Sequence, residues 1–374
     1  MGDQDVAALR GTLSIKSNPQ YDYTVFIGRF RPFHNGHLAV VKRAIALGRH
    51  AIVMVGSCGQ ARSHRNPFVF REVEAFIRGS LSVEENLRLT VVPLMDRYND
   101  VAWTRDVLVA ARNVILQRQQ EPRAAKVCLI GHHKDQSSDY LDLFPQWAKE
   151  GVADTTKLSA TPIRDDYFAD AKAAIATWSE AVPACVGGFM ESFAATSDYA
   201  RLVEEAEAVR AHKALWKDAP YEPTFTSADA VVLCAGHLLV VPRNPRSKAP
   251  ITGRGLLSLP GRIVGKHERI LDAVLKDLRE EIRIKVPTNV LSGSVLATEI
   301  FDSPYRDPRG RFISHSFLIQ LSDTELPKVR DNGPLWMPLD EVEASPDRFW
   351  NDNWHIAQTM QEYCRERRLL TRVC

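Results

Sequence analysis

Two histidines, His34 and His37, lie in a short glycine-bounded stretch (residues 28–37, GRFRPFHNGH) between an apolar run and a helical pattern. The run 23–28 is typical of a buried β-strand, and the residues from 38 onward are typical of a helix. Backbone N–H groups at the N-terminus of a helix attract phosphate, and two imidazole rings would add donors to the same anion. This stretch therefore predicts a nucleotide-binding site.

A second stretch, residues 158–164 (LSATPIR), joins an apolar strand end to a new helix. Ser159 or Thr161 can cap that helix, and Pro162 suits its first turn. Arg164 lies one turn further on, where its guanidinium can reach a phosphate oxygen through two N–H groups. The stretch alone would also fit an ordinary capped helix with a surface arginine, but the double-histidine loop favours a phosphate site.

The elements that must position these residues alternate between strand and helix. Strand-like runs occur at 23–28, 51–56, 88–94 and 126–131, and helical patterns lie between them at 36–48, 69–81 and 101–119. Such alternation predicts an α/β fold with a doubly wound parallel sheet, in which ligands bind at the carboxyl ends of the strands. A helical stretch follows, from about 161 to 216.

Both stretches resemble signatures of the nucleotidylyltransferase superfamily, G-x-F-x-P-x-H-x-G-H and I-S-x-T-x-x-R, over roughly residues 22–190. The closest resemblance is to nicotinamide mononucleotide (NMN) adenylyltransferases of the archaeal type. It implies a Rossmann-like sheet and a nucleotide site that includes Gly28, Arg29, Phe30 and Gly36. Asn66 belongs to an N-P-F segment of that family, and residues 96–103 resemble its nicotinamide-binding stretch. The chain departs from the pattern at Arg31, where this branch usually has glutamine, and after Phe68, where Val69 replaces threonine and Val73 follows Glu72.

The resemblance implies adenylyl transfer from ATP to NMN, giving NAD and pyrophosphate, with Mg²⁺ bridging phosphates. His34 and His37 would stabilise charge on the triphosphate, and Arg164 would hold the terminal phosphates together with Ser159 and Thr161. Trp103 would stack on the nicotinamide ring, with Asn99 near its amide, although a tryptophan on a helix is also an ordinary core residue. Transfer to another phosphate nucleophile, such as a pantetheine phosphate, stays open.

The pattern of strand-like and helical segments changes after two prolines, Pro220 and Pro223. They end the helical stretch and suit a linker. Strand-like runs at 228–233, 237–242 and 312–321 surround a charged helix predicted over 268–285. We therefore expect an arm at 1–20, a nucleotidylyltransferase domain at 21–190, a helical connection and linker at 191–223, and a separate α+β domain at 224–374.

Three carboxylates of the charged helix, Asp277, Glu280 and Glu281, lie at positions i, i+3 and i+4 and so share one face. They would repel one another unless they are solvated or bound to cations. A solvated helix face is the ordinary interpretation, whereas the glycine–proline loop ahead of the helix favours a Mg²⁺ or Mn²⁺ site.

This segment resembles the Nudix signature, G-x5-E-x7-R-E-U-x-E-E-x-G-U, where U is aliphatic. The resemblance implies metal ligation by Glu268, Asp277, Glu280 and Glu281, with Glu280 as a ligand or base. The leading glycine is Arg262, the Arg-Glu pair is Lys276-Asp277, and the late glycine is Arg283. Fusions of these two domains form a bifunctional family whose Nudix partner hydrolyses ADP-ribose to AMP and ribose 5-phosphate. An inactive Nudix domain that binds nucleotides as a regulatory module is the alternative.

Composition limits the other function classes. The chain has 374 residues, 45% of them hydrophobic, and a net charge of +2. That charge balance, without a basic stripe interleaved with aromatic residues, argues against a nucleic-acid partner. No apolar run approaches the roughly 20 residues that span a membrane. The six cysteines form no C-x-x-C pair, so we expect reduced, mostly buried thiols in a cytoplasmic protein. A homo-oligomer is consistent with the superfamily.

Overall fold

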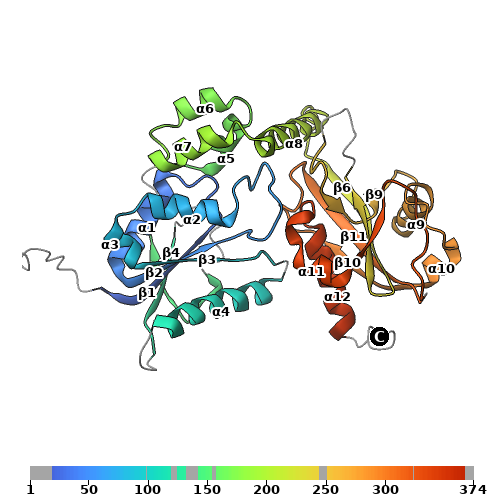
Figure 1. The fold of residues 1–374 in the computed structure, drawn as a ribbon, viewed down its shortest axis with the longest axis horizontal. Coiled ribbons are helices and arrows are strands. Elements are labelled where there is room, and N and C mark those ends of the chain that lie inside the picture. Colours follow the sequence, from blue (N-terminus) through green and yellow to red (C-terminus); the bar gives the residue numbers. More distant parts are fainter. Residues whose placement is uncertain are drawn as a thin grey trace, which may run out of the picture.

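The chain folds into two units, each built around its own β-sheet, which are joined by a long helix (Figure 1). The computed structural model describes residues 19–97, 99–118, 124–131, 142–153, 157–243, 251–322 and 324–366. The predicted N-terminal arm lies outside the described residues except for its last two positions. The predicted domain boundaries stay predictions.

The first unit contains a parallel sheet with the strand order β3-β2-β1-β4-β5. Its strands are β1 (Tyr21–Gly28), β2 (Gly48–Val55), β3 (Leu89–Pro93), β4 (Val127–Gly131) and β5 (Ala148–Gly151). In the register, Tyr23 of β1 is paired with His50 of β2 on one side and with Val127 of β4 on the other. The chain fills the sheet outward from β1 in one direction and then in the other. The double-histidine loop follows β1 at this reversal, where doubly wound folds bind their ligands.

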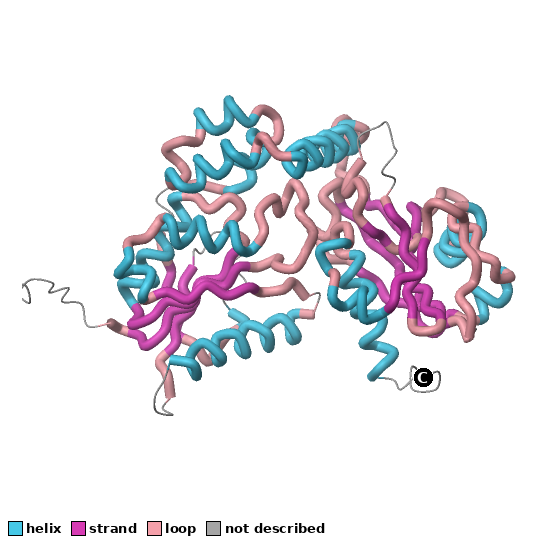
Figure 2. Tube along the Cα trace, viewed as in Figure 1, coloured by secondary structure: helices cyan, strands magenta, loops and turns pink. Residues whose placement is uncertain are grey.

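Helices cover both faces of this sheet (Figure 2). They are α1 (Asn35–Leu47), α2 (Phe70–Gly79), α3 (Val83–Leu87) and α4 (Asp100–Arg118). Helices α1 and α2 contribute to one hydrophobic core, whereas α4 packs on the opposite face through Val107, Ala111 and Val114. The α/β fold with a parallel Rossmann-like sheet is thus confirmed.

The predicted helical stretch is a group of four helices on the face that α1 and α2 cover. They are α5 (Ala160–Tyr167), α6 (Ala171–Thr177), α7 (Ala184–Phe193) and α8 (Ser197–Ala214). Ile163, Val186 and Leu202 of this group share the core of α1 and α2. Helix α8 reaches from this group to the second unit (Figure 1).

The second unit has a mixed sheet with the order β10-β11-β6-β7-β12, in which β6 and β11 are parallel and the other pairs are antiparallel. The short strands β8 and β9 pair with β7 and β6. The strands are β6 (Thr224–Cys234), β7 (His237–Pro242), β8 (Leu257–Ser258), β9 (Gly261–Ile263), β10 (Val295–Phe301), β11 (Arg311–Gln320) and β12 (Leu335–Pro338). This separate α+β unit was also predicted.

Two groups of helices flank the second sheet. They are α9 (Ile270–Glu280) and α10 (Thr288–Gly293) in one core, and α11 (Leu339–Ala344) and α12 (Asn353–Glu366) in the other, with a short 3₁₀ turn at Pro346–Arg348. The predicted helix 268–285 was too long at both ends. It ends at Glu280, and Arg283 follows with φ +54°, a left-handed conformation that favours glycine. Arg283 occupies the late glycine position of the signature.

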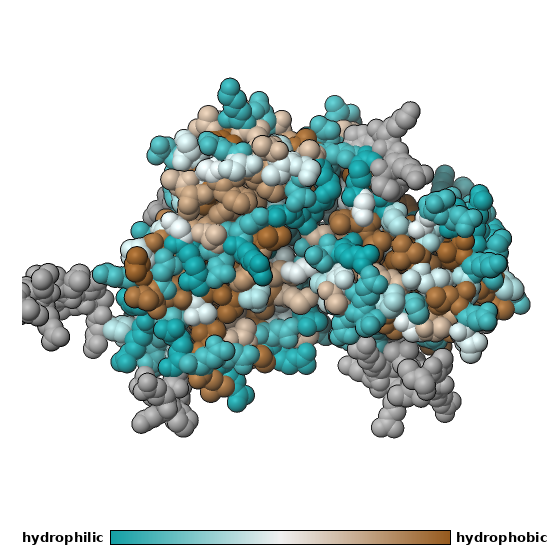
Figure 3. Space-filling model, in the orientation of Figure 1, coloured by the Kyte–Doolittle hydropathy of each residue, from teal (hydrophilic) through white to brown (hydrophobic). Residues whose placement is uncertain are grey.

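No described helix is both long enough and apolar enough to cross a membrane. On the face seen in Figure 3, apolar residues are interspersed with hydrophilic ones. Among the cysteines that the structure describes in full, Cys58, Cys128 and Cys234 are buried, Cys185 is exposed, and none forms a disulfide.

Candidate active sites

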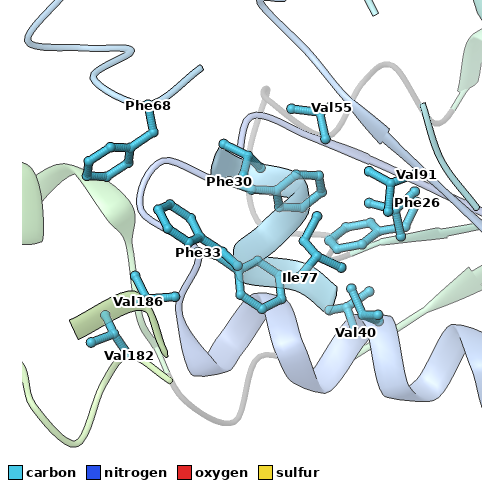
Figure 4. Packing of buried hydrophobic residues seen from close by; sticks show 14 of the residues in the cluster. Phe26, Phe30, Phe33, Val40, Val55, Phe68, Ile77, Val91, Val182 and Val186 are labelled. Carbon is cyan, nitrogen blue, oxygen red and sulfur yellow. The ribbon is translucent and has the colours of Figure 1, made fainter. Parts of the chain in front are cut away.

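The double-histidine loop is anchored to the core by its own phenylalanines. Phe30 and Phe33 are fully buried and point into the cluster that contains Phe26 and Ile77 (Figure 4). Phe30 has φ +57°, and a Cβ on Gly28 would lie 2.7 Å from the Phe30 ring. Gly28 is therefore needed because the Phe30 ring folds back over it. Burial of both rings fixes the backbone that presents the histidines.

His34 and His37 form a stacked pair at the N-terminus of α1. His34 is the N-cap residue, and its Nδ1 accepts the backbone N–H of His37 at 3.3 Å. The His34 N–H in turn lies 3.4 Å from Nδ1 of His37. The two rings have centroids 3.6 Å apart and planes 20° apart. This reciprocal arrangement corresponds to a capping box built from two imidazoles.

The hydrogen bonds of this pair define which nitrogen carries the proton. Because Nδ1 of each ring accepts a backbone N–H, the neutral ring has its proton on Nε2. Each histidine can therefore donate through Nε2 to an anion. Gly36, between them, is buried in the first turn of α1. The arrangement supplies two side-chain donors at the positive end of a helix dipole.

Arg164 is held against the histidine loop. Its Nη1 donates to the carbonyl of Arg31 at 2.7 Å, and its Nη2 donates to the hydroxyl of Thr161 at 3.2 Å. Of the two capping candidates, Ser159 is the N-cap of α5 and accepts the N–H of Thr161. The structure thus brings together the two signatures that are about 130 residues apart in the chain.

Several arginines gather around Arg164. Burial and the nearby positive charges of Arg29, Arg65 and Arg31 together lower the pKa of Arg164 to about 10, with Asp165 opposing. Cations that destabilise one another's charge in this way favour binding of a polyanion. Arg65 had no recognisable signal in the sequence, because a single arginine in a loop fits no motif.

Arg31, the departure from the family pattern, has a structural role. Its side chain is only 2% exposed and donates to the carbonyls of Phe68 and Gly56, each at 2.7 Å. It therefore ties the histidine loop to the segment after β2 and to the N-P-F segment. Glu72 accepts the N–H of Val69 at 2.8 Å, so the first turn of α2 is capped without the usual threonine.

A cavity of about 510 Å³ adjoins the arginines, and three predicted residues, Arg29, Asn66 and Trp103, line it. Trp103 also packs against Phe144, with ring centroids 5.9 Å apart, so it serves the core and the cavity wall together. Asn99 does not line this cavity. Its Oδ1 accepts the N–H groups of Val101 and Ala102 and so caps α4. The predicted contact of Asn99 with a nicotinamide amide stays a prediction.

Asp96 is a cavity residue to which sequence reasoning gave no role. Its carboxylate accepts the N–H of Ser57 at 3.0 Å and the Ser57 hydroxyl at 2.6 Å. These bonds join the loop after β3 to the loop after β2. The sequence had placed it only within the stretch 96–103 that resembles the nicotinamide-binding segment and just beyond a strand end, a position that many structural residues share.

The second candidate site lies at the loop before α9 and along that helix. Glu268 accepts the N–H of Gly265 at 3.0 Å and lies 3.8 Å from Arg262 and 3.9 Å from Lys276. These contacts give Glu268 a role in fixing the loop. Lys276 contacts Glu268 through a single ammonium group, whereas the arginine of the signature could donate two parallel hydrogen bonds to a carboxylate.

The three helix carboxylates have different surroundings. Asp277 is 7% exposed, and its pKa is raised to about 6 by burial and by the charge of Glu281, with Arg262 opposing. Glu281 is exposed and lies 4.0 Å from Arg330. Glu280 is hydrogen-bonded to its neighbour Arg279 at 2.8 Å. The charge of Glu281 therefore acts on Asp277, whereas the carboxylate of Glu280 is engaged by Arg279.

Asp229 of β6 is a further carboxyl close to Asp277 that sequence reasoning missed. It is partly buried beside Ser314, and loss of solvent around the carboxyl raises its pKa to about 6. A Cβ on Gly261 would lie 2.1 Å from Asp229 Oδ1, so glycine is required there. An aspartate within an apolar strand gives no sequence signal, because only the tertiary fold places it beside α9.

The charges of Asp277 and Glu281 fit a divalent cation. The charge of Glu281 disfavours ionisation of Asp277, and a cation bound by both would remove that cost. Within the part of the chain that the structure describes, however, no three His, Cys, Asp or Glu side chains come together as a metal-binding group. The predicted four-carboxylate site therefore stays a prediction.

Comparison with protein families assigns each half of the chain. The Cytidylyltransferase-like family model matches residues 25–134, and the NUDIX domain model matches residues 224–360. Both resemblances that the sequence motifs indicated are confirmed.

Individual relatives refine this assignment. A nicotinamide/nicotinic acid mononucleotide adenylyltransferase of Acinetobacter baylyi is 38% identical over 150 residues, which cover 40% of this chain and 77% of that protein. A nicotinamide-nucleotide adenylyltransferase of Halobacterium salinarum is 38% identical over 82 residues, 22% of this chain and 46% of that protein.

One solved structure matches both units. It is a bifunctional NMN adenylyltransferase/ADP-ribose pyrophosphatase from Francisella tularensis, complexed with AMP and a manganese ion. The TM-score is 0.80 with 28% identity, and the match covers 92% of this chain and 99% of that one. Both domains and their order in the chain thus have a counterpart in one known molecule. The chain therefore belongs to the mononucleotide adenylyltransferase family and carries a NUDIX domain after its adenylyltransferase domain.

Proposed function

We propose that the first domain transfers AMP from ATP to nicotinamide mononucleotide, giving NAD and pyrophosphate. The observation that carries the proposal is the hydrogen bond from Arg164 to the Arg31 carbonyl, which joins the second signature to the loop that presents the stacked His34 and His37. Arg29, whose charge acts on Arg164, lines a cavity together with Trp103. The named activities of the Acinetobacter and Francisella proteins support it.

The reaction needs positioning and charge stabilisation more than a base. The attacking group is a phosphate, which is already ionised at neutral pH, so no proton has to be removed from it. Nε2 of His34 and of His37 would donate to the triphosphate as negative charge grows on the departing pyrophosphate. Arg164, pinned by the Arg31 carbonyl and Thr161, would bind the terminal phosphates in a fixed orientation.

The identity of the nucleophile can be tested at Trp103. If its indole stacks on a nicotinamide ring, Trp103→Leu should raise the KM for NMN about fivefold, as expected for the loss of about 1 kcal/mol of stacking. The KM for ATP should not change. Trp147→Leu is the matched control, because Trp147 stacks on Phe144 in the same cluster but does not line the cavity. An unchanged KM for NMN in Trp103→Leu would favour a different phosphate nucleophile.

We propose that the second domain hydrolyses ADP-ribose to AMP and ribose 5-phosphate. The effect of the Glu281 charge on Asp277 supports this, together with the pyrophosphatase named in the Francisella structure. A bound Mg²⁺ or Mn²⁺ would supply Lewis-acid activation of water and of the pyrophosphate. Asp277 and Glu281 would hold it, Glu268 would shape the loop, and Glu280 would serve as a ligand or base after leaving Arg279.

Two assays on one purified preparation test both proposals. One follows NAD formation from ATP and NMN with Mg²⁺, and the other follows AMP release from ADP-ribose with Mg²⁺ or Mn²⁺. Absence of NAD formation by the intact protein would overturn the first proposal. Binding of ADP-ribose without AMP release would overturn the second and assign the NUDIX domain a regulatory role. Both substrates are metabolites of the cytoplasm, which is where we propose the protein acts.

A further inference from the structure

The cavity beside Trp103 is lined by both domains. From the first domain come Arg29, Ser57, Asp96 and Trp103, and from the second come Ser303, Tyr305, Arg306, Pro308, Asn351 and His355. Its volume of about 510 Å³ is in the ordinary range of small-molecule sites, roughly 300–1,000 Å³. Ser303 to Pro308 belong to the segment after β10, Asn351 lies just before α12, and His355 lies in its first turn.

Polar contacts hold the two domains together around this cavity. Nη1 of Arg65 donates to the carbonyl of Tyr305 at 2.6 Å. Further along, Nε of Arg254 in the second domain donates to Glu204 of α8 at 2.7 Å. The pKa of Arg65 is lowered by burial and by the charge of Arg29. Arg65, one of the arginines around Arg164, is therefore oriented by a backbone carbonyl of the second domain.

The segment after β10 also lines a second cavity, which contains Arg164. A cavity of about 570 Å³ contains Thr161, Arg164 and Arg65 together with Tyr305 and Pro308. Tyr305, Pro308 and Arg65 line both cavities. The segment thus borders both the cavity that Trp103 lines and the cavity that Arg164 lines.

We propose that the second domain completes the mononucleotide pocket of the first domain, with His355 and Asn351 as specificity-determining residues for NMN. This inference rests on the proposed adenylyl transfer and adds a function for the NUDIX domain that is separate from its own chemistry.

The charges around His355, where both domains line the cavity, support a role for this residue in binding NMN. His355 is 6% exposed, and its pKa is lowered by burial while the carboxylates of Asp96 and Asp352 act in the opposite direction. Asp96 belongs to the first domain, so His355 lies within electrostatic reach of the predicted nicotinamide-binding stretch. Asp352 is neutralised by Arg306 through a 2.7 Å ion pair in which both side chains are 6% exposed.

The chemistry of the cavity fits a mononucleotide. Arg29 and Arg65 offer cations for one phosphate, and Trp103 offers an aromatic face for one ring. Two wall atoms, Oδ1 of Asn66 and Oε2 of Glu205, are buried without a hydrogen-bond partner among the described residues. Buried acceptors of this kind need donors, and ribose hydroxyls or a carboxamide would supply them.

Two substitutions test whether residues of the second domain that line the cavity contact NMN. His355→Gln removes the imidazole but keeps a polar side chain of similar reach. Asn351→Gly removes the carboxamide that donates to the Arg306 carbonyl, and glycine tolerates the φ of +53° at this position. His237→Gln is the matched control, because His237 lies on β7 of the same domain and does not line the cavity.

Each full-length variant is assayed for KM and kcat with NMN, with ATP and with ADP-ribose, alongside its melting temperature. We expect His355→Gln and Asn351→Gly to raise the KM for NMN at least about fivefold, as for the loss of one or two polar contacts. The KM for ATP, the kcat and the melting temperature should stay close to those of His237→Gln.

The outcomes are distinct. An unchanged KM for NMN in both variants, in a protein that makes NAD, would overturn this inference and leave the proposed function intact. A rise confined to the KM for ADP-ribose would also overturn it and assign the cavity to the second reaction. Absence of NAD formation in the unmodified protein would instead overturn the proposed function itself.

Discussion

The two candidate sites differ in how far the protein itself satisfies their charged groups. In the first, His34 and His37 cap a helix, and Arg164 is bonded to a carbonyl and a hydroxyl. In the second, burial and the charge of Glu281 raise the pKa of Asp277 to about 6. Donors can be fixed by backbone acceptors before a ligand arrives, whereas neighbouring carboxylates stay unfavourable until a cation joins them. The first site is thus preorganised, and the second, on the proposal made above, is completed by a metal ion.

The largest expected effect tests the preorganised site. His37→Ala removes one of the two Nε2 donors and should lower kcat for NAD formation about 10²- to 10³-fold, the usual effect of losing one such donor. ADP-ribose hydrolysis, measured on the same sample, should be unchanged and serves as the internal control. A fall of less than about tenfold would mean that the stacked pair does not contact the reacting phosphates.

A smaller loss is expected at the metal-dependent site, and it should distinguish two neighbouring glutamates. Glu281→Gln removes a charge that acts on Asp277, so the half-saturating Mn²⁺ concentration for AMP release should rise at least about tenfold. Glu280→Gln is the matched variant, because Glu280 is bonded to Arg279. Metal titrations of both variants make the comparison. An equal loss in Glu280→Gln would show that this side chain leaves Arg279 and joins the metal site.

A further expected effect concerns stability and follows from the Asp229 carboxyl beside the second site. A rise in the pKa of Asp229 from 3.8 to about 6 corresponds to about 3 kcal/mol. A raised folded-state pKa stabilises the protonated fold below about pH 4, and this contribution is lost as the pH rises through 6. Asp229→Asn should therefore melt several degrees higher than the parent at pH 7.5 and at nearly the same temperature at pH 4.

Thermal melts at these two pH values make that measurement. A variant that melts lower than the parent at pH 7.5 would mean that the ionised Asp229 is favourably paired, against the cost assigned to its burial.

Prediction from sequence succeeded where a function requires a short local pattern. The loop 28–37 and the helix start at Ser159 were both located correctly, because caps and strand-to-helix turns are coded by neighbouring residues. The predicted helix 268–285 was too long because charge and apolar spacing continue past Glu280, and only the left-handed φ of Arg283 ends the helix. Asp229 and Arg65 were missed because each acts through contacts with distant segments.

The sequence by itself determined two domains, their fold classes and the residues of two signatures, since each depends on local spacing and on the alternation of strand and helix. Only the tertiary structure decided that Arg164 is bonded to the Arg31 carbonyl, that Asn99 caps a helix, and that Glu268 fixes a loop. It also decided that residues near 305 and 355 line a cavity beside Trp103. Contacts between segments hundreds of residues apart arise from the packing of complete surfaces, and no short pattern in the chain records them.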